Sequence, residues 1–125
     1  MRPRSYDIVW VRGTTEQIKF GFKAGDDAIP ADDVRFTAYN KGGKSLAFRL
    51  TLENNMGVSV DSAPDGRYLF SPTAEQTRSL TQTKADGVPQ NTYEIELRNG
   101  ASERVYVLGT IDAIGGINDD ESDAS

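Results

Sequence analysis

The sequence predicts an all-β fold, a single antiparallel β-sandwich of about seven to nine strands with one short helix. Apolar and polar residues alternate with a period of two along most of the chain, as in strands that are buried on one face. Turn-forming Gly, Asn and Asp residues interrupt these segments at nearly regular spacing. The 125 residues suit one domain with its own core, and no internal repeat or linker divides them.

Four segments show the alternation most clearly, at residues 17–22, 34–39, 46–53 and 93–98. Their predicted core-facing residues are Ile18, Phe20, Phe22, Val34, Phe36, Ala38, Leu46, Phe48, Leu50, Leu52, Tyr93, Ile95 and Leu97. The dipeptide Asn99-Gly100 separates the last segment from another apolar one, and this pair of residues favours a tight turn. We therefore expect a hairpin at residues 99–100.

Two further segments, residues 6–11 and 105–111, are apolar on both faces. Strands of this kind lie deep in a sheet or are covered by another chain. Trp10, Tyr106 and Leu108 belong to these segments. Because aromatic side chains are enriched in the buried centres of interfaces, we predict that Trp10, Tyr106 and Leu108 contact a partner protein.

One segment departs from the strand pattern, and we predict a short helix near residues 72–80. Ser71 is a candidate N-cap, and Pro72 would occupy the first helical position. Glu75 would lie near the positive end of the helix dipole. The helix would connect two strands across one end of the sandwich.

The charge distribution divides the chain into a nearly neutral body and an acidic end. The formal net charge is -5, and residues 119–125 contain four acids and no base. The remainder holds 15 acids against 14 bases. We therefore expect a flexible N-terminus at residues 1–5, a sandwich domain at 6–117 and a disordered acidic tail at 118–125. The alternative is that the tail is a docking peptide for a basic partner.

The composition excludes several classes of function. The chain has no Cys and no His, so disulfides, thiolate metal sites and Ser-His-Asp catalysis are absent. No apolar run approaches the roughly 20 residues of a membrane span. A nearly neutral body offers no basic surface for nucleic acid. We expect a protein that is not an enzyme, has no cofactor and binds neither nucleic acid nor membrane.

Clusters of carboxylates are the remaining candidates for chemistry. Asp26, Asp27, Asp32 and Asp33 are weak candidates for a calcium site, and they lack the spacing of an EF-hand loop. Turn formation explains these aspartates more simply, and we predict no metal site. The pairs Asp61/Asp65 and Glu94/Glu96 could act as acid and base, but turns and solvated strand faces account for them. We predict no catalytic residues.

Four short motifs follow one another in a characteristic order. They are Arg12-Gly13-Thr14-Thr15 before the segment at 18–22, Ile29-Pro30 before Val34-Arg35-Phe36-Thr37, Asp65-Gly66-Arg67-Tyr68 leading into residues 71–77, and residues 91–97 before a closing strand at 104–111. This order resembles the small immunoglobulin-like β-sandwich of tailed-bacteriophage structural proteins, including the N-terminal domain of baseplate upper proteins. The similarity extends over about residues 6–113.

The resemblance implies an immunoglobulin-like sandwich that serves as a non-catalytic virion protein. It would be a tail, baseplate or fibre-adaptor component, made in the bacterial cytoplasm and present in many copies among other virion proteins. A capsid decoration protein with the same fold is one alternative. A small carbohydrate-binding sandwich, with a row of exposed aromatic residues and Asp26 or Asp32 assisting, is another.

Overall fold

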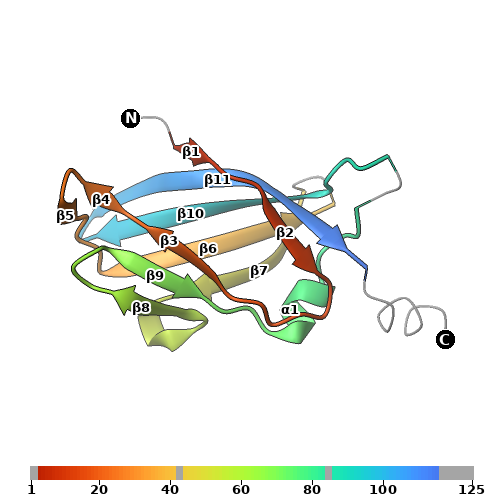
Figure 1. Ribbon diagram of the computed structural model, residues 1–125, viewed down its shortest axis with the longest axis horizontal. Coiled ribbons are helices and arrows are strands. Elements are labelled where there is room, and N and C mark those ends of the chain that lie inside the picture. Colours follow the sequence, from red (N-terminus) through yellow and green to blue (C-terminus); the bar gives the residue numbers. More distant parts are fainter. Residues whose placement is uncertain (1–2, 42–43, 84–85, 116–125) are drawn as a thin grey trace.

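Two β-sheets pack face to face in the computed structural model, which describes residues 3–41, 44–83 and 86–115 (Figure 1). The larger sheet contains β1 (Arg4–Ser5), β2 (Ile8–Val11), β6 (Asp33–Asn40), β7 (Ser45–Thr51), β10 (Asn91–Asn99) and β11 (Ser102–Ile114). The smaller sheet contains β3 (Ile18–Gly21), β8 (Val58–Ser62) and β9 (Arg67–Phe70). A hairpin of β4 (Lys23–Ala24) and β5 (Asp27–Ala28) lies at one end of the sandwich (Figure 1).

The strand order is that of an immunoglobulin-like sandwich. The larger sheet has the order β1/β2–β11–β10–β6–β7, and the smaller sheet has the order β3–β9–β8. In the immunoglobulin nomenclature, β11, β10, β6 and β7 correspond to strands G, F, C and C′, and β3, β9 and β8 correspond to strands B, E and D. The first strand, β1/β2, corresponds to strand A and pairs with G. The predicted fold class is therefore confirmed. The described residues form eleven strands, because the first strand is split into β1 and β2 and because β4 and β5 form an additional hairpin.

The period-two pattern predicted most of the long strands correctly. β6, β7 and β10 fall on predicted segments, and β10 and β11 form the predicted hairpin, in which Asn99 pairs with Ser102. One core-facing assignment is wrong, since Leu46 is 56% exposed. The register between β6 and β7 shifts between Ala38 and Tyr39, and this irregularity turns Leu46 outward.

A single hydrophobic core fills the space between the sheets, with Phe36 at its centre. Its ring stacks on Tyr93 with centroids 5.1 Å apart and also contacts the rings of Trp10, Phe48 and Phe70. Trp10 is 0% exposed, so the prediction that it contacts a partner is wrong. Residue type alone did not reveal that position 10 faces inward on β2, where the large indole fills the core instead.

The predicted helix exists but begins later than expected. It is α1 (Ala74–Arg78). The other helical element among the described residues is a short 3-10 turn at Glu53–Asn55, after β7. The N-cap of α1 is Thr73 rather than Ser71. The Thr73 hydroxyl accepts a hydrogen bond from the Gln76 amide, and the Gln76 side chain accepts one from the Thr73 amide. This reciprocal capping box satisfies two backbone donors and sets the start of the helix.

A buried threonine attaches α1 to the segment that follows β2. The Thr77 hydroxyl accepts a hydrogen bond from the Gly13 amide at 3.0 Å and donates one to the Thr14 carbonyl at 2.8 Å. The side chain of Asn91, 0% exposed, similarly bonds both the amide and the carbonyl of Thr81. These bonds satisfy buried polar groups and fix α1 across the end of the sandwich.

The N-terminal segment crosses directly over a glycine of β11. A Cβ atom at Gly109 would lie 2.0 Å from the Tyr6 carbonyl oxygen, so any larger residue would collide with the backbone there. The Tyr6 amide donates to the Leu108 carbonyl at 3.2 Å. The Tyr93 hydroxyl donates to the Tyr6 carbonyl, and burial raises the pKa of Tyr93, which keeps this donor protonated. We call this arrangement the Tyr6 crossing.

The crossing joins two short strands that both pair in parallel with β11. Arg4 and Ser5 of β1 pair with Val107 and Leu108, and β2 pairs with residues 111–114. The sandwich therefore begins before residue 6, and the prediction of a flexible segment is wrong for residues 4 and 5. The predicted tail at 118–125 lies outside the described residues.

Replacing Gly109 with Ala will destabilise the protein, because the added methyl group must displace the Tyr6 carbonyl. We expect the free energy of unfolding to fall by about 1–3 kcal/mol, as for other overpacked sites. Urea unfolding followed by tryptophan fluorescence measures it. Gly21→Ala is the matched control, since a Cβ there would be 3.7 Å from its nearest neighbour. Equal stability of the two variants would contradict the proposed collision.

Candidate functional site

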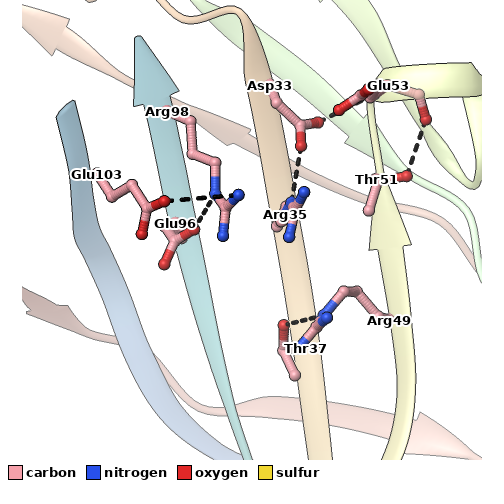
Figure 2. Close-up of polar contacts among 9 residues, drawn as sticks. All are labelled: Asp33, Arg35, Thr37, Arg49, Thr51, Glu53, Glu96, Arg98 and Glu103. Carbon is pink, nitrogen blue, oxygen red and sulfur yellow. Dashed lines mark hydrogen bonds and ion pairs between the residues drawn. The ribbon is translucent and has the colours of Figure 1, made fainter. Parts of the chain in front are cut away.

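The outer face of the larger sheet has a polar part and an apolar part. The polar part is a network of hydrogen bonds and ion pairs across β6, β7, β10 and β11 (Figure 2). Its members are Asp33, Arg35, Thr37, Arg49, Thr51, Glu53, Glu96, Arg98 and Glu103. Alternation along β6 and β10 places these side chains opposite the core.

Asp33 is the most deeply buried acid of this network, at 4% exposed. One carboxylate oxygen accepts from Arg35 Nε at 2.7 Å, and the other accepts from the Glu53 amide at 3.0 Å. Burial alone would raise the pKa of Asp33. The hydrogen bonds from Arg35 and from the Glu53 backbone outweigh burial and hold the pKa below its usual value.

Two further basic side chains, Arg98 and Arg49, also have partners within the network. Arg98 Nε lies 2.6 Å from Glu96, and its Nη1 lies 3.5 Å from Glu103 (Figure 2). Arg49 Nε donates to the Thr37 hydroxyl at 3.1 Å. Arg35 and Arg98 are therefore neutralised by acids of the network, whereas Arg49 is bonded to a neutral hydroxyl.

The apolar part lies along β2 and the outward positions of β11. We call Val9, Val11, Leu108 and Ile114 the apolar strip. Their exposed fractions are 57%, 42%, 45% and 45%. Val11 pairs with Ile114, while Leu108 lies further along the same face of β11. The strip borders one edge of the sheet, since β2 pairs with β11 alone among the described strands.

The strip explains why two segments are apolar on both faces. In β2 the inward positions are buried in the core, and Val9 and Val11 face outward. The interpretation that both faces are buried within the monomer is wrong for these strands. Leu108 lies on the exposed surface, as an interface residue must, and its predicted contact with a partner stays a prediction.

A cleft of about 990 Å³ opens at the end of the sandwich that carries β4 and β5. We call it the cationic cleft, because its lining brings together the basic side chains Arg4, Lys23, Arg67 and Arg104 and two carboxylates, Asp27 and Asp65. Phe22 and Tyr106 also line it, and their rings meet edge to face with centroids 5.9 Å apart. Tyr106, a predicted interface residue, therefore lies in this cleft rather than beside Leu108.

The four cations of the cleft differ in how they are paired. Lys23 lies 3.2 Å from Asp65, and Arg67 bonds Asp61. Arg4 and Arg104 instead lie over aromatic rings, 5.7 Å from the Phe22 centroid and 5.9 Å from the Tyr106 centroid.

Within the part of the chain that the structure describes, neither Arg4 nor Arg104 has a carboxylate within ion-pair distance. Arg4 also donates to the Gly21 carbonyl at 2.9 Å, which orients its guanidinium without neutralising it. The cleft therefore retains uncompensated positive charge.

The four aspartates considered for calcium serve different local roles. Asp32 accepts a hydrogen bond from the Gly100 amide at 2.7 Å and braces the β10–β11 turn. Asp33 belongs to the polar network, and Asp26 and Asp27 lie at the β4–β5 hairpin. Among the described residues, no group of three or more acids is placed to hold a metal ion.

The pair Asp61 and Asp65 has the wrong electrostatics for a general acid. The Arg67 hydrogen bond lowers the pKa of Asp61, and the Ser62 and Lys23 hydrogen bonds lower that of Asp65. A general acid at neutral pH requires a raised pKa. These carboxylates are held ionised as ion-pair partners instead.

The sequence did not point to the cationic cleft. Its basic residues are far apart in the chain and occur singly among alternating residues, so no linear cluster marks them. The apolar strip had a signal, namely the unusual hydrophobicity of residues 6–11 and 105–111, but the signal did not identify Val9, Val11 or Ile114.

A scan of protein-family models gives no match to this chain, and a comparison with curated proteins gives none either. Within the described ranges, no helix is long and apolar enough to cross a membrane. The two surfaces above are therefore interpreted from their own geometry.

Asp33→Asn will destabilise the protein at neutral pH but not in acid. Because the folded-state pKa of Asp33 is lowered, its stabilisation is complete above the unfolded value of about 3.9 and is lost as the pH falls through the folded pKa. We expect a loss of about 1–3 kcal/mol at pH 7, typical of a buried hydrogen bond to a charged group.

Urea unfolding of both proteins between pH 7 and pH 3 tests this dependence. The difference between them should shrink as the pH falls below about 4. Asp26→Asn, at an exposed turn, controls for the change in net charge. A difference that persists at the lowest pH would show that the Asp33 charge is not the source of the stabilisation.

Proposed function

We propose that this protein is a non-catalytic structural component of a tailed-bacteriophage virion, located in the tail or baseplate or serving as a fibre adaptor. It attaches to neighbouring virion proteins through the outer face of its larger sheet at the β2–β11 edge. Many copies occupy equivalent positions in a symmetric assembly. The resemblance in the order of sequence motifs suggests this class of protein, and the apolar strip supports attachment as its role.

The observation that carries the proposal is the apolar strip. Its four large side chains are 42–57% exposed although the core is otherwise well filled. Burying apolar surface contributes about 25 cal/mol per Å², so covering the strip would stabilise a complex. Each contact is modest in size, and a repeated assembly makes modest contacts sufficient because neighbouring copies hold one another in place.

The paired polar network beside the strip also suits a repeated contact. Arg35 and Arg98 are each bonded to an acid of the network, so a neighbour that packs nearby does not have to compensate these charges (Figure 2). An apolar area bordered by polar groups has the anatomy of a protein interface.

A carbohydrate-binding role fits the aromatic residues less well. Sugar stacking requires exposed ring faces, but Trp10, Tyr68 and Tyr93 are buried. The rings of Phe22 and Tyr106 in the cleft are covered by arginine side chains. The structure therefore offers no row of exposed aromatic side chains within the described residues.

Antibody labelling of intact particles, viewed by electron microscopy, tests the proposal. Label at the tail tip or collar is expected for an adaptor. Label spread over the capsid would identify a decoration protein, which overturns the tail location. Absence of label from every particle would overturn the virion role.

The double variant Val9→Asp, Leu108→Asp will fold but will fail to join particles. Both side chains are exposed, so the substitutions leave the core intact, while two carboxylates in a buried contact are costly. Western blotting of purified particles, assembled in cells that make the variant in place of the original chain, measures incorporation. We expect a loss of about tenfold or more, corresponding to about 1.4 kcal/mol.

Val60→Asp is the matched control on the smaller sheet, where Val60 is 52% exposed. It adds a charge to a strand of the same domain outside the strip, and we expect normal incorporation. Circular dichroism confirms folding of all variants. Normal incorporation of the strip variant, or equal loss with the control, would contradict attachment through the strip.

A further inference from the structure

We infer that the cationic cleft is a docking site for the acidic segment of a second copy of this chain, residues 119–123. The occupant is an acidic peptide with four carboxylates, contributed by Asp119, Asp120, Glu121 and Asp123. The contact joins the cleft end of one copy to the opposite end of another. This inference does not depend on the proposed function, since it requires only copies of this chain.

Charge complementarity is the first argument. The cleft lining contains four cations and two carboxylates, and the guanidinium groups of Arg4 and Arg104 have no acidic partner among the described residues. The segment 119–123 has no base to compensate its four acids. The rest of the chain is close to neutral, so the attraction is local to the cleft rather than general.

The chemistry of the cleft suits carboxylates in particular. Guanidinium groups can donate two parallel hydrogen bonds to a carboxylate. Arg4 and Arg104 are held over the rings of Phe22 and Tyr106, which restricts their side-chain freedom before anything binds. A ligand with several adjacent carboxylates can contact both arginines at once.

Distance indicates that the segment comes from another copy. Arg104 lies near the start of β11, and Ile114 is its last residue, at the end of the sandwich opposite the β4–β5 hairpin (Figure 1). At about 3.3 Å per residue, these two positions are about 33 Å apart.

The acidic segment is too close in sequence to Ile114 to return over that distance. A fully extended chain spans at most about 3.6 Å per residue, so Asp119 reaches about 18 Å from Ile114 and Glu121 about 25 Å. Arg4 lies nearer, since it pairs with Val107, about 23 Å from Ile114. The backbone of Asp119 and Asp120 falls short of that position as well, so the four acids cannot all occupy the cleft of their own chain. The cleft of a neighbouring copy can approach the acidic segment directly, so the length of chain after Ile114 does not limit this contact.

Such a contact is heterologous, because the surface on one copy differs from the surface on the next. Contacts of this kind generate rings when they close and filaments when they do not. The attraction between exposed charges weakens as salt shortens the screening length. Association through the cleft should therefore depend on ionic strength.

Fluorescence anisotropy tests the contact with a labelled peptide of residues 116–125. The receptor is the full-length chain with its own acids neutralised by Asp119→Asn, Asp120→Asn, Glu121→Gln and Asp123→Asn. We expect saturable binding that is lost when the peptide carries the same four neutral residues. Raising the salt from about 0.05 to about 0.5 M should also abolish it.

A charge reversal locates the binding site. Arg104→Glu in the receptor should weaken peptide binding by about tenfold or more, since an attraction becomes a repulsion. Lys44→Glu, an exposed residue on the β6–β7 connection, changes the net charge equally and should leave binding unchanged.

Several results would overturn the inference. Equal weakening by Arg104→Glu and Lys44→Glu would show general attraction to net charge. No peptide binding by a folded receptor would exclude the site. If the chain with neutralised acids differs from the original chain in thermal stability but not in sedimentation coefficient, the acids act within their own chain. None of these results affects the strip variants, so failure here is distinguishable from failure of the proposed function.

Discussion

The Tyr6 crossing is the constraint on which both surfaces of this protein depend. The N-terminal segment can follow β11 only if its backbone passes over residue 109, and a glycine there leaves the necessary room. The Tyr93 hydroxyl, held protonated by burial, satisfies the Tyr6 carbonyl at the crossing point. On one side of the crossing, β1 carries Arg4 to the cationic cleft. On the other side, β2 carries Val9 and Val11 to the apolar strip.

A second irregularity, in β11, completes the cleft. The register between β10 and β11 shifts between Ile95 and Glu96. Ile95 pairs with Val107 and Glu96 pairs with Val105, so Tyr106 has no partner residue on β10. A bulge of this type turns a side chain away from the regular alternation. Tyr106 consequently meets Phe22 across the end of the sandwich, and Arg104 lies above its ring. The strand that presents Leu108 to solvent thus also provides the floor of the cleft.

Irregularities of register also explain how far the sequence could predict the structure. Alternation and turn residues predicted the sandwich and the hairpin at Asn99-Gly100 because both depend on local chemistry. The outward position of Leu46, the inward position of Trp10 and the placement of Tyr106 depend on register between strands distant in sequence. Composition therefore suggested that residues 6–11 contact a partner, but it selected the aromatic core residue rather than its exposed valine neighbours.

The contrast between the two groups of charges indicates where an anionic partner can bind. On the outer sheet face, Arg35 and Arg98 are each paired with an acid two residues away on the same strand, so a further carboxylate would have to displace an existing partner there (Figure 2). In the cleft, Arg4 and Arg104 are oriented by aromatic rings and a backbone carbonyl, which fix their position but leave their charge uncompensated. Because these two guanidinium groups are oriented but not neutralised, an acid that binds them loses less side-chain entropy and still gains the full electrostatic attraction. An assembly that used both surfaces would combine an apolar contact, which is insensitive to salt, with an ionic contact that salt weakens.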